Sequence, residues 1–205
     1  MTPRYWSQAT ADLSARDPVL ARLIDAHSAT RLRRRGDAFT ALARSIVGQQ
    51  ISVRAAAGVW GRVTEAVQEF VPGHVLVLRL EQLRACGLSR QKAAYLLDLA
   101  AHFHSGALQP ARWRRIGDEQ VIAELTQVKG IGRWTAEMFL IFHLLRPDVL
   151  PVGDLGLQRA IGLHYNRGNP MSETRMRRVA RAWEPWRTVA TWYLWRSLEP
   201  VPMQS

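Results

Sequence analysis

Hydrophobic residues recur along this chain at helical rather than alternating spacing. In the segment 17–27, apolar side chains fall on one face, and Pro18 stands in the first turn, where a missing backbone N–H costs no hydrogen bond. Only one run, VLVLRL at residues 75–80, reads as a strand, and it lacks a partner strand. The pattern therefore predicts an all-α protein with roughly ten helices.

Residues that start and stop helices divide this pattern further. Asp37 can cap a helix over 37–50, and Ser52 can cap a helix over 52–70. A proline and a glycine at positions 72 and 73 then end the second of these helices. The remaining expected helices cover 75–87, 89–106, 118–128 with an acidic cap, 134–146, 149–165, 172–183 and 184–200.

The charge of the chain points to a polyanionic partner. The formal net charge is +11 and the sequence pI is about 11.2, which favours nucleic acid or, less specifically, an anionic membrane surface. Lys92 and Lys129 are the only lysines, so nearly all of the basic charge is arginine. A bias in the encoding genome would explain the arginine-to-lysine ratio, but it would not explain the excess of positive charge.

The cysteine and histidine residues limit which disulfides and metal sites the chain can form. A single cysteine, Cys86, rules out an intramolecular disulfide and a four-thiolate metal or iron–sulfur site, and its neighbours suggest a core thiol. The histidines show no metal-ligand spacing, since His102 and His104 point to different helix faces, so no bound catalytic metal is expected. No run approaches the roughly 18 apolar residues of a membrane span. We expect a soluble, cytoplasmic protein without a membrane partner, associated with the nucleoid if the source is bacterial.

A glycine-rich turn stands between two predicted helices. It reads Lys129, Gly130, Ile131, Gly132 and Arg133. Glycines allow close backbone approach, and a helix start presents unpaired N–H groups, so this helix-hairpin-helix arrangement can bind phosphate oxygens. The lysine and the arginine can add charge. Glycines also end ordinary helices, so the motif alone is weak.

Asp154, in LPVGDLGLQRAIG, follows the hairpin in the sequence. Its presence makes the hairpin more informative than the glycines alone. Locally, it can simply cap the next helix. A helix-hairpin-helix, a Gly/Pro-rich loop and an Asp together resemble the DNA glycosylase superfamily named for these features. Within it, the GIG hairpin followed by WTA is similar to the 3-methyladenine DNA glycosylase II branch. Other matching stretches are FTALARSIVGQQIS, GLSRQKAAYLLDLA and RAWEPWRTVATWYLW, so the resemblance runs from Asp17 to the C-terminus.

The resemblance implies a fold of two helical lobes with an active-site cleft between them. One lobe is a helical barrel over 37–147, with the helix-hairpin-helix at 120–146. The other combines 1–36 with 148–205 and carries the catalytic Asp154. The resemblance also implies a compact member that lacks the additional N-terminal mixed α/β domain of the best-known bacterial enzyme.

The implied activity is base excision repair by a monofunctional glycosylase. The enzyme flips a damaged nucleotide out of the duplex and hydrolyses the N-glycosidic bond of an alkylated purine such as 3-methyladenine. Ring alkylation makes the purine cationic and a good leaving group, so one carboxylate can suffice where most glycosidases use two. Asp154 would stabilise the oxocarbenium-like sugar, assist water, or both. No cofactor is implied, although the resemblance allows a monovalent cation at the hairpin.

The resemblance also implies base-binding and gap-filling residues. Trp134 and Trp195 match the family's stacking tryptophans, which suits a cationic base, although each tryptophan could instead be a core aromatic. Met138 stands where the bacterial enzyme has a pocket tyrosine, and Gln50 stands where that enzyme inserts a leucine into the gap left by the base. Gln50, Lys129, Gly130, Ile131, Gly132 and Arg133 form the expected DNA-binding set.

Two alternatives remain beside the alkylpurine glycosylase. Met138 keeps open a glycosylase for oxidised or mismatched bases. A non-catalytic binder of DNA structure would explain the charge and the hairpin, with Asp154 acting as a helix cap. The expected partner in every case is double-stranded DNA, containing damaged bases if the protein is an enzyme, and the expected state is a monomer.

Overall fold

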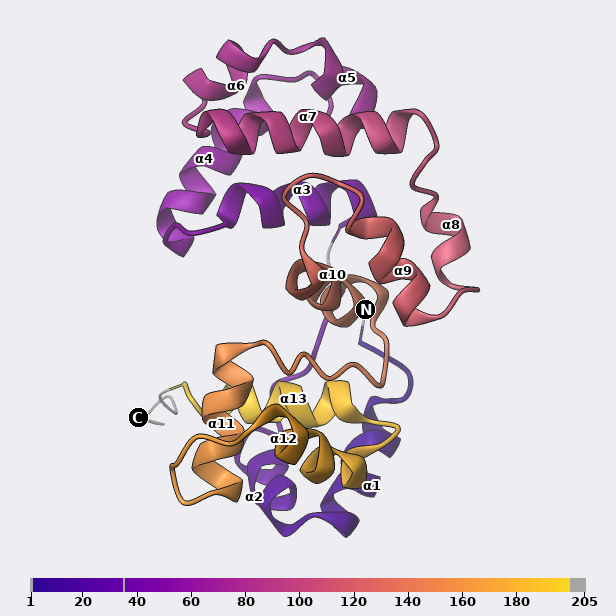
Figure 1. Ribbon diagram of the computed structural model, residues 1–205, viewed down its shortest axis with the longest axis vertical. Coiled ribbons are helices and arrows are strands. Elements are labelled where there is room, and N and C mark those ends of the chain that lie inside the picture. Colours follow the sequence, from indigo (N-terminus) through magenta and orange to yellow (C-terminus); the bar gives the residue numbers. More distant parts are fainter. Residues whose placement is uncertain (1, 35, 200–205) are drawn as a thin grey trace. The chain divides into compact units, whose positions relative to one another are not determined.

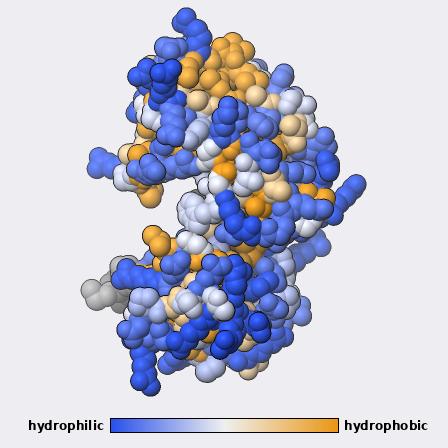
Figure 2. Space-filling model, in the orientation of Figure 1, coloured by the Kyte–Doolittle hydropathy of each residue, from blue (hydrophilic) through white to orange (hydrophobic). Residues whose placement is uncertain are grey.

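The computed structural model describes residues 2–34 and 36–199 (Figure 1). Every regular element in these ranges is a helix, which confirms the all-α prediction. The described residues form two compact units, one of 2–34 with 140–199 and the other of 36–139. Figure 2 shows that hydrophilic residues dominate the visible face of both units.

The first unit joins the two ends of the chain. Its helices are α1 (Trp6–Arg16), α2 (Pro18–Ala26), the π-helical turn η1 (Leu140–Leu144), α11 (Leu155–Tyr165), α12 (Glu173–Ala180), the 3-10 turn η2 (Arg181–Trp183) and α13 (Arg187–Arg196). Helix α13 packs against α1, α2 and α11. Because it has neighbours on several sides, most of its residues are buried, and it lacks the polar face of a surface helix.

Asp17 ties three segments of the first unit together. Its Oδ1 accepts hydrogen bonds from the backbone N–H groups of Val19 and Leu20, at 2.9 and 3.2 Å, and so caps α2. Its Oδ2 accepts from the Tyr165 hydroxyl at 2.8 Å and from the Trp183 indole N–H at 3.0 Å. Burial raises the pKa of Tyr165, and the hydrogen bond to Asp17 raises it further. One buried carboxylate therefore satisfies four donors from α2, α11 and η2.

The second unit is built around α7. Its helices are α3 (Ala38–Gly48), α4 (Val53–Glu65), α5 (Pro72–Val77), α6 (Leu80–Ala85), α7 (Arg90–His104), α8 (Pro110–Trp113), α9 (Asp118–Leu125) and α10 (Arg133–Phe139). Helix α7 packs against α3, α5 and α6. A chain of edge-to-face aromatic contacts runs from Phe39 through Phe103 and Trp113 to Phe139, with centroid distances of 5.3, 6.2 and 5.3 Å. Cys86 is buried, as predicted.

The predicted caps of the second unit are confirmed in part. Asp37 Oδ1 accepts from Thr40 N at 2.9 Å and caps α3, and the Ser52 hydroxyl accepts from Ala55 N at 3.3 Å and caps α4. The acidic cap expected for the helix over 118–128 is wrong. Gly117 holds the cap position, and Gln120 Oε1 accepts from its N–H at 3.1 Å.

Several predicted boundaries are also wrong. The helix expected over 52–70 ends at Glu65, and the proline at 72 opens α5 instead of ending a helix, because its fixed φ suits a first turn. The segment 75–87 divides into α5 and α6, with Leu78 extended between them. The segment 134–146 changes at Leu140 into the π-helical turn. Helices α1 and α8 were not predicted, and the end of the helix expected over 184–200 lies outside the described residues.

We expect Asp17→Ala to lower the free energy of unfolding by about 2–4 kcal/mol, because it removes a helix cap and leaves the half-buried Tyr165 hydroxyl and the buried Trp183 indole N–H without their acceptor. Chemical denaturation measures the loss. Asp12→Ala is the matched control, since Asp12 accepts one indole N–H, that of Trp186 at 2.8 Å, and caps nothing. Equal losses in the two variants would contradict the role assigned to Asp17.

Candidate active site and DNA-binding surface

Asp154 holds the cap position of α11. Its backbone N–H donates to Pro151 O at 2.9 Å in a tight turn, and its Oδ1 accepts from Leu157 N at 2.7 Å. The capping role considered for this residue is therefore real. Capping also places a half-buried carboxylate at the positive end of a helix, which favours negative charge there.

The same carboxylate oxygen receives a second hydrogen bond. Trp195, on α13, donates its indole N–H to Asp154 Oδ1 at 2.8 Å. A glycine at position 156 permits this approach, since a Cβ there would lie 3.1 Å from Oδ1 and 3.4 Å from the indole ring. Two donors from different helices thus fix the orientation of one carboxyl group.

Trp195 is fixed in turn by an aromatic neighbour. Its ring stacks on Phe142 of η1, with a centroid distance of 5.7 Å and an interplanar angle of 10°. Sequence reasoning missed Phe142, because it sits within a continuous apolar run and carries no motif. That Trp195 stacks on a base stays a prediction. In the described structure its polar edge is directed to Asp154.

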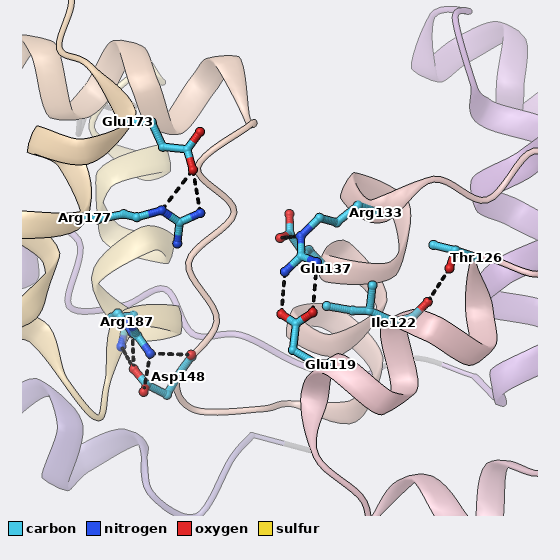
Figure 3. Close-up of polar contacts among 9 residues, drawn as sticks. All are labelled: Glu119, Ile122, Thr126, Arg133, Glu137, Asp148, Glu173, Arg177 and Arg187. Carbon is cyan, nitrogen blue, oxygen red and sulfur yellow. Dashed lines mark hydrogen bonds and ion pairs between the residues drawn. The ribbon is translucent and has the colours of Figure 1, made fainter.

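The loop that leads from η1 toward Asp154 is anchored to α13. Arg187 pairs with Asp148 through Nε and an Nη atom, both at 2.7 Å from carboxylate oxygens (Figure 3). Thr188, fully buried, donates its hydroxyl to Arg146 O at 2.6 Å and accepts from Val149 N at 3.0 Å. These contacts limit the freedom of the chain shortly before the catalytic candidate.

The predicted hairpin lies between α9 and α10. Gly130 has a φ of 84°, and a Cβ there would lie 2.1 Å from a ring carbon of Tyr95, so glycine is required for both reasons. A Cβ at Gly132 would meet nothing within 4 Å, so the fold itself does not demand glycine at that position. A bare backbone at Gly132 suits the close approach of a ligand.

The other hairpin residues differ in what they expose. Lys129 extends into solvent, with its side chain 74% exposed, and its Nζ lies 3.8 Å from Asp98. The Ile131 side chain is buried, and its N–H donates to Val128 O at 3.1 Å. Of the two, Lys129 is therefore the one whose side chain can meet a phosphate.

Arg133 is occupied within the protein. Its guanidinium pairs with both carboxylate oxygens of Glu119, at 2.9 and 2.5 Å, and its Nε lies 3.1 Å from the buried Glu137 (Figure 3). The hydrogen bond to Glu119 raises the pKa of Arg133. In the free protein, this positive charge joins α9 to α10, so its predicted DNA contact would have to compete with two carboxylates.

The remaining predicted site residues of the second unit, one gap-filling and two base-binding, are exposed or half-buried. Gln50 is exposed and has a φ of 57°, which non-glycine residues adopt only at a cost. Trp134 is 48% exposed in the first turn of α10, and Met138 lies one turn later, half-buried. Within this unit, the structure groups the hairpin with Trp134. In the first unit, it brings Asp154 and Trp195 together.

Neither a cluster of candidate metal ligands nor a membrane-spanning helix occurs in the described ranges. Across residues 2–34 and 36–199, no three His, Cys, Asp or Glu side chains gather closely enough to hold a metal ion. No helix of that part of the chain combines the length and apolar character needed to cross a bilayer.

Comparisons with known proteins identify the family of the chain. Residues 43–187 match the family described as HhH-GPD superfamily base excision DNA repair protein. DNA-3-methyladenine glycosylase 1 of Schizosaccharomyces pombe is 33% identical over 184 residues, covering 87% of this chain and 80% of that protein. DNA-3-methyladenine glycosylase 2 of Escherichia coli is 33% identical over 191 residues, covering 86% of this chain and 64% of that protein.

Solved structures give the same picture. The Schizosaccharomyces pombe 3-methyladenine DNA glycosylase in complex with abasic DNA superimposes with a TM-score of 0.79 at 30% identity, covering 93% of this chain and 96% of that chain. A DNA-3-methyladenine glycosidase from Bacillus halodurans gives 0.85 at 35% identity, covering 96% and 91%. The chain therefore belongs to the helix-hairpin-helix superfamily of base excision DNA repair proteins, in its 3-methyladenine DNA glycosylase family.

Proposed function

We propose that this protein is a monofunctional DNA glycosylase that removes alkylated purines, 3-methyladenine among them, from double-stranded DNA. The observation that carries the proposal is the carboxylate of Asp154, whose Oδ1 accepts hydrogen bonds from Leu157 N and the Trp195 indole. A binder of DNA structure would need a cap at this position. It would not need an indole from α13 that directs the same carboxylate.

The chemistry follows from the leaving group. Alkylation at a ring nitrogen gives the purine a positive charge, so the glycosidic bond breaks with its electron pair moving to the base, which departs neutral. Positive charge then develops on the sugar, and the Asp154 carboxylate stabilises it electrostatically. Water adds its oxygen to the sugar carbon and releases a proton, leaving an abasic site in an intact strand. This reaction requires no cofactor.

Recognition of the damaged base falls to aromatic faces. The exposed ring of Trp134 can stack on the flipped purine, and its π-face attracts a cationic base. Met138, one turn along α10, adds a polarisable side chain that adapts to base shape. In this proposal Trp195 has two roles, presenting the edge of its ring to Asp154 and contributing apolar surface near the site.

In this proposal the second unit binds the DNA backbone. The hairpin backbone at Gly130 and Gly132 and the Lys129 ammonium hold phosphates without reading sequence. Gln50 fills the gap left by the flipped base through hydrogen bonds, and Arg133 positions the hairpin by joining α9 to α10. The protein acts as a monomer on DNA that contains damaged bases.

Asp154→Asn tests the catalytic assignment. Asparagine also caps helices, so the variant should fold and bind DNA, but base excision should fall by about 10²–10³-fold, because a neutral amide cannot balance charge on the sugar. Release of 3-methyladenine from a lesion duplex under single-turnover conditions measures the rate. Asp37→Asn, the same change at the cap of α3, is the matched control and should keep the wild-type rate. A well-folded Asp154→Asn with near-normal excision would remove Asp154 from the mechanism.

Trp195→Phe tests the hydrogen bond to the carboxylate. The phenyl ring can still stack on Phe142, but the N–H is lost, so the excision rate constant should fall roughly tenfold for both cationic and neutral lesions, with little change in DNA affinity. Trp192→Phe is the matched control, because the buried Trp192 indole N–H has no hydrogen-bond partner to lose. Equal rates in Trp195→Phe and wild type would show that the indole N–H is dispensable.

The absence of strand cleavage tests the hydrolytic route. Family members that cut DNA use a lysine directly after the hairpin, where this chain has Trp134, and a Schiff base needs a deprotonated amine near the sugar. We expect borohydride to trap no covalent adduct, and gels run without alkali or heat to show intact strands after base release. An adduct, with cleavage that tracks base release, would overturn the water mechanism.

A further inference from the structure

Three side chains at intervals of three residues mark one face of α7. They are Lys92, Tyr95 and Asp98, and residues at this spacing are neighbours on a helix surface. Each contacts a segment to which the proposed function gives a DNA-binding role: the loop around Gln50, or the hairpin. Neither the hairpin motif nor the catalytic carboxylate accounts for this arrangement.

Lys92 holds the end of α3. Its Nζ donates to Val47 O at 2.9 Å and to Gln49 O at 2.5 Å. The last carbonyls of a helix lack partners within the helix, so a lysine donor can satisfy them. These hydrogen bonds also fix the direction in which the chain leaves the helix. Partial burial of the amine lowers the pKa of Lys92. The next residue along the chain is Gln50.

The conformation of Gln50 needs such support. A non-glycine residue with a φ of 57° is strained by about 1 kcal/mol or more, and strain of this kind persists where neighbouring contacts fix the backbone. The side chains of Gln50 and Ile51 are exposed, so the strained segment presents them to solvent instead of to the core. The Lys92 contacts fix the carbonyl directly before this residue.

The same segment is joined to the hairpin. Gln49 Nε2 donates to Gly130 O at 2.8 Å, which links the loop to the first hairpin glycine. Tyr95 lies against Gly130 so closely that any Cβ there would overlap its ring. Asp98 Oδ2 accepts from Lys129 N at 2.9 Å, and its Oδ1 lies 3.8 Å from Lys129 Nζ. Helix α7 thus contacts both segments, and Gln49 connects them.

We propose that this face of α7 is a positioning surface that sets the Gln50 loop and the hairpin as one preformed DNA-binding element, with Lys92 as the positioning residue for Gln50. The inference rests on the proposed function, in which Gln50 fills the gap beside a flipped base. Gap filling requires a fixed distance between the filling side chain and the gripped phosphates. Fixing that distance before binding removes the entropy cost of ordering the loop on DNA.

Lys92→Met tests the proposal through binding, without catalysis. The readout is the ratio of the dissociation constants for an undamaged duplex and for a duplex with an abasic-site analogue, since the undamaged duplex has no gap to fill. We expect Lys92→Met to lower this preference by at least about fivefold, the equivalent of about 1 kcal/mol. Arg90→Met, which removes an exposed charge from the same helix, should leave the preference unchanged.

A double variant separates positioning from general stability. If Lys92 acts through Gln50, then Lys92→Met combined with Gln50→Ala should lose no more preference than the larger single loss, whereas independent roles would multiply the losses. Should Lys92→Met fail to fold, Gln49→Leu removes only the link to Gly130 O and should lower the same ratio. The proposal would be overturned if the ratio were unchanged in the single variants, or if the losses of the two single variants multiplied in the double variant. It would also be overturned if the wild type showed no preference for the abasic analogue. A wild type that prefers the analogue but releases no damaged base would contradict the proposed function alone.

Discussion

The geometry of the candidate catalytic site depends on one carboxylate oxygen that accepts two hydrogen bonds. Asp154 Oδ1 receives Leu157 N from its own helix and the Trp195 indole from α13, so the carboxyl group can neither rotate nor withdraw without losing a bond. Several neighbouring features follow from this constraint. A glycine at 156 leaves room for the indole, Phe142 holds the ring, and the Asp148–Arg187 pair anchors the preceding loop to the helix that carries the indole. Preorganised donors of this kind let a charge stabilise a transition state without reorganising during the reaction.

The two units divide the work of the proposed reaction. In the proposal, the unit of residues 2–34 and 140–199 stabilises the charge on the sugar, and the unit of residues 36–139 binds phosphates and fills the gap. The second unit also carries the exposed aromatic face of Trp134. Within the second unit the basic side chains serve different ends. Lys129 extends into solvent, Lys92 caps a helix end, and Arg133 is neutralised by two carboxylates. The net positive charge therefore does not by itself identify which basic residues meet DNA.

The sequence was informative where a local motif determines structure. The caps at Asp37, Ser52 and Asp154 were predictable, because a short polar side chain before a helical run has few other uses. The division of 75–87 into two helices and the π-helical turn after α10 were not, because tertiary packing overrides a continuous helical pattern. Phe142 and Lys92 were also missed as site residues. Their partners lie 53 residues away at Trp195 and 45 and 43 residues away at Val47 and Gln49, a separation that no local pattern encodes.

Product identification tests the central claim most directly. The protein would be incubated with duplexes that carry methylated purines, oxidised bases or mismatches, and the released bases would be identified by mass spectrometry. The account predicts free 3-methyladenine and other alkylated purines, because their cationic rings are attracted to aromatic faces and leave readily enough for a single fixed carboxylate to suffice. Release of only oxidised or mismatched bases, or of no base at all by a folded, DNA-binding protein, would contradict it.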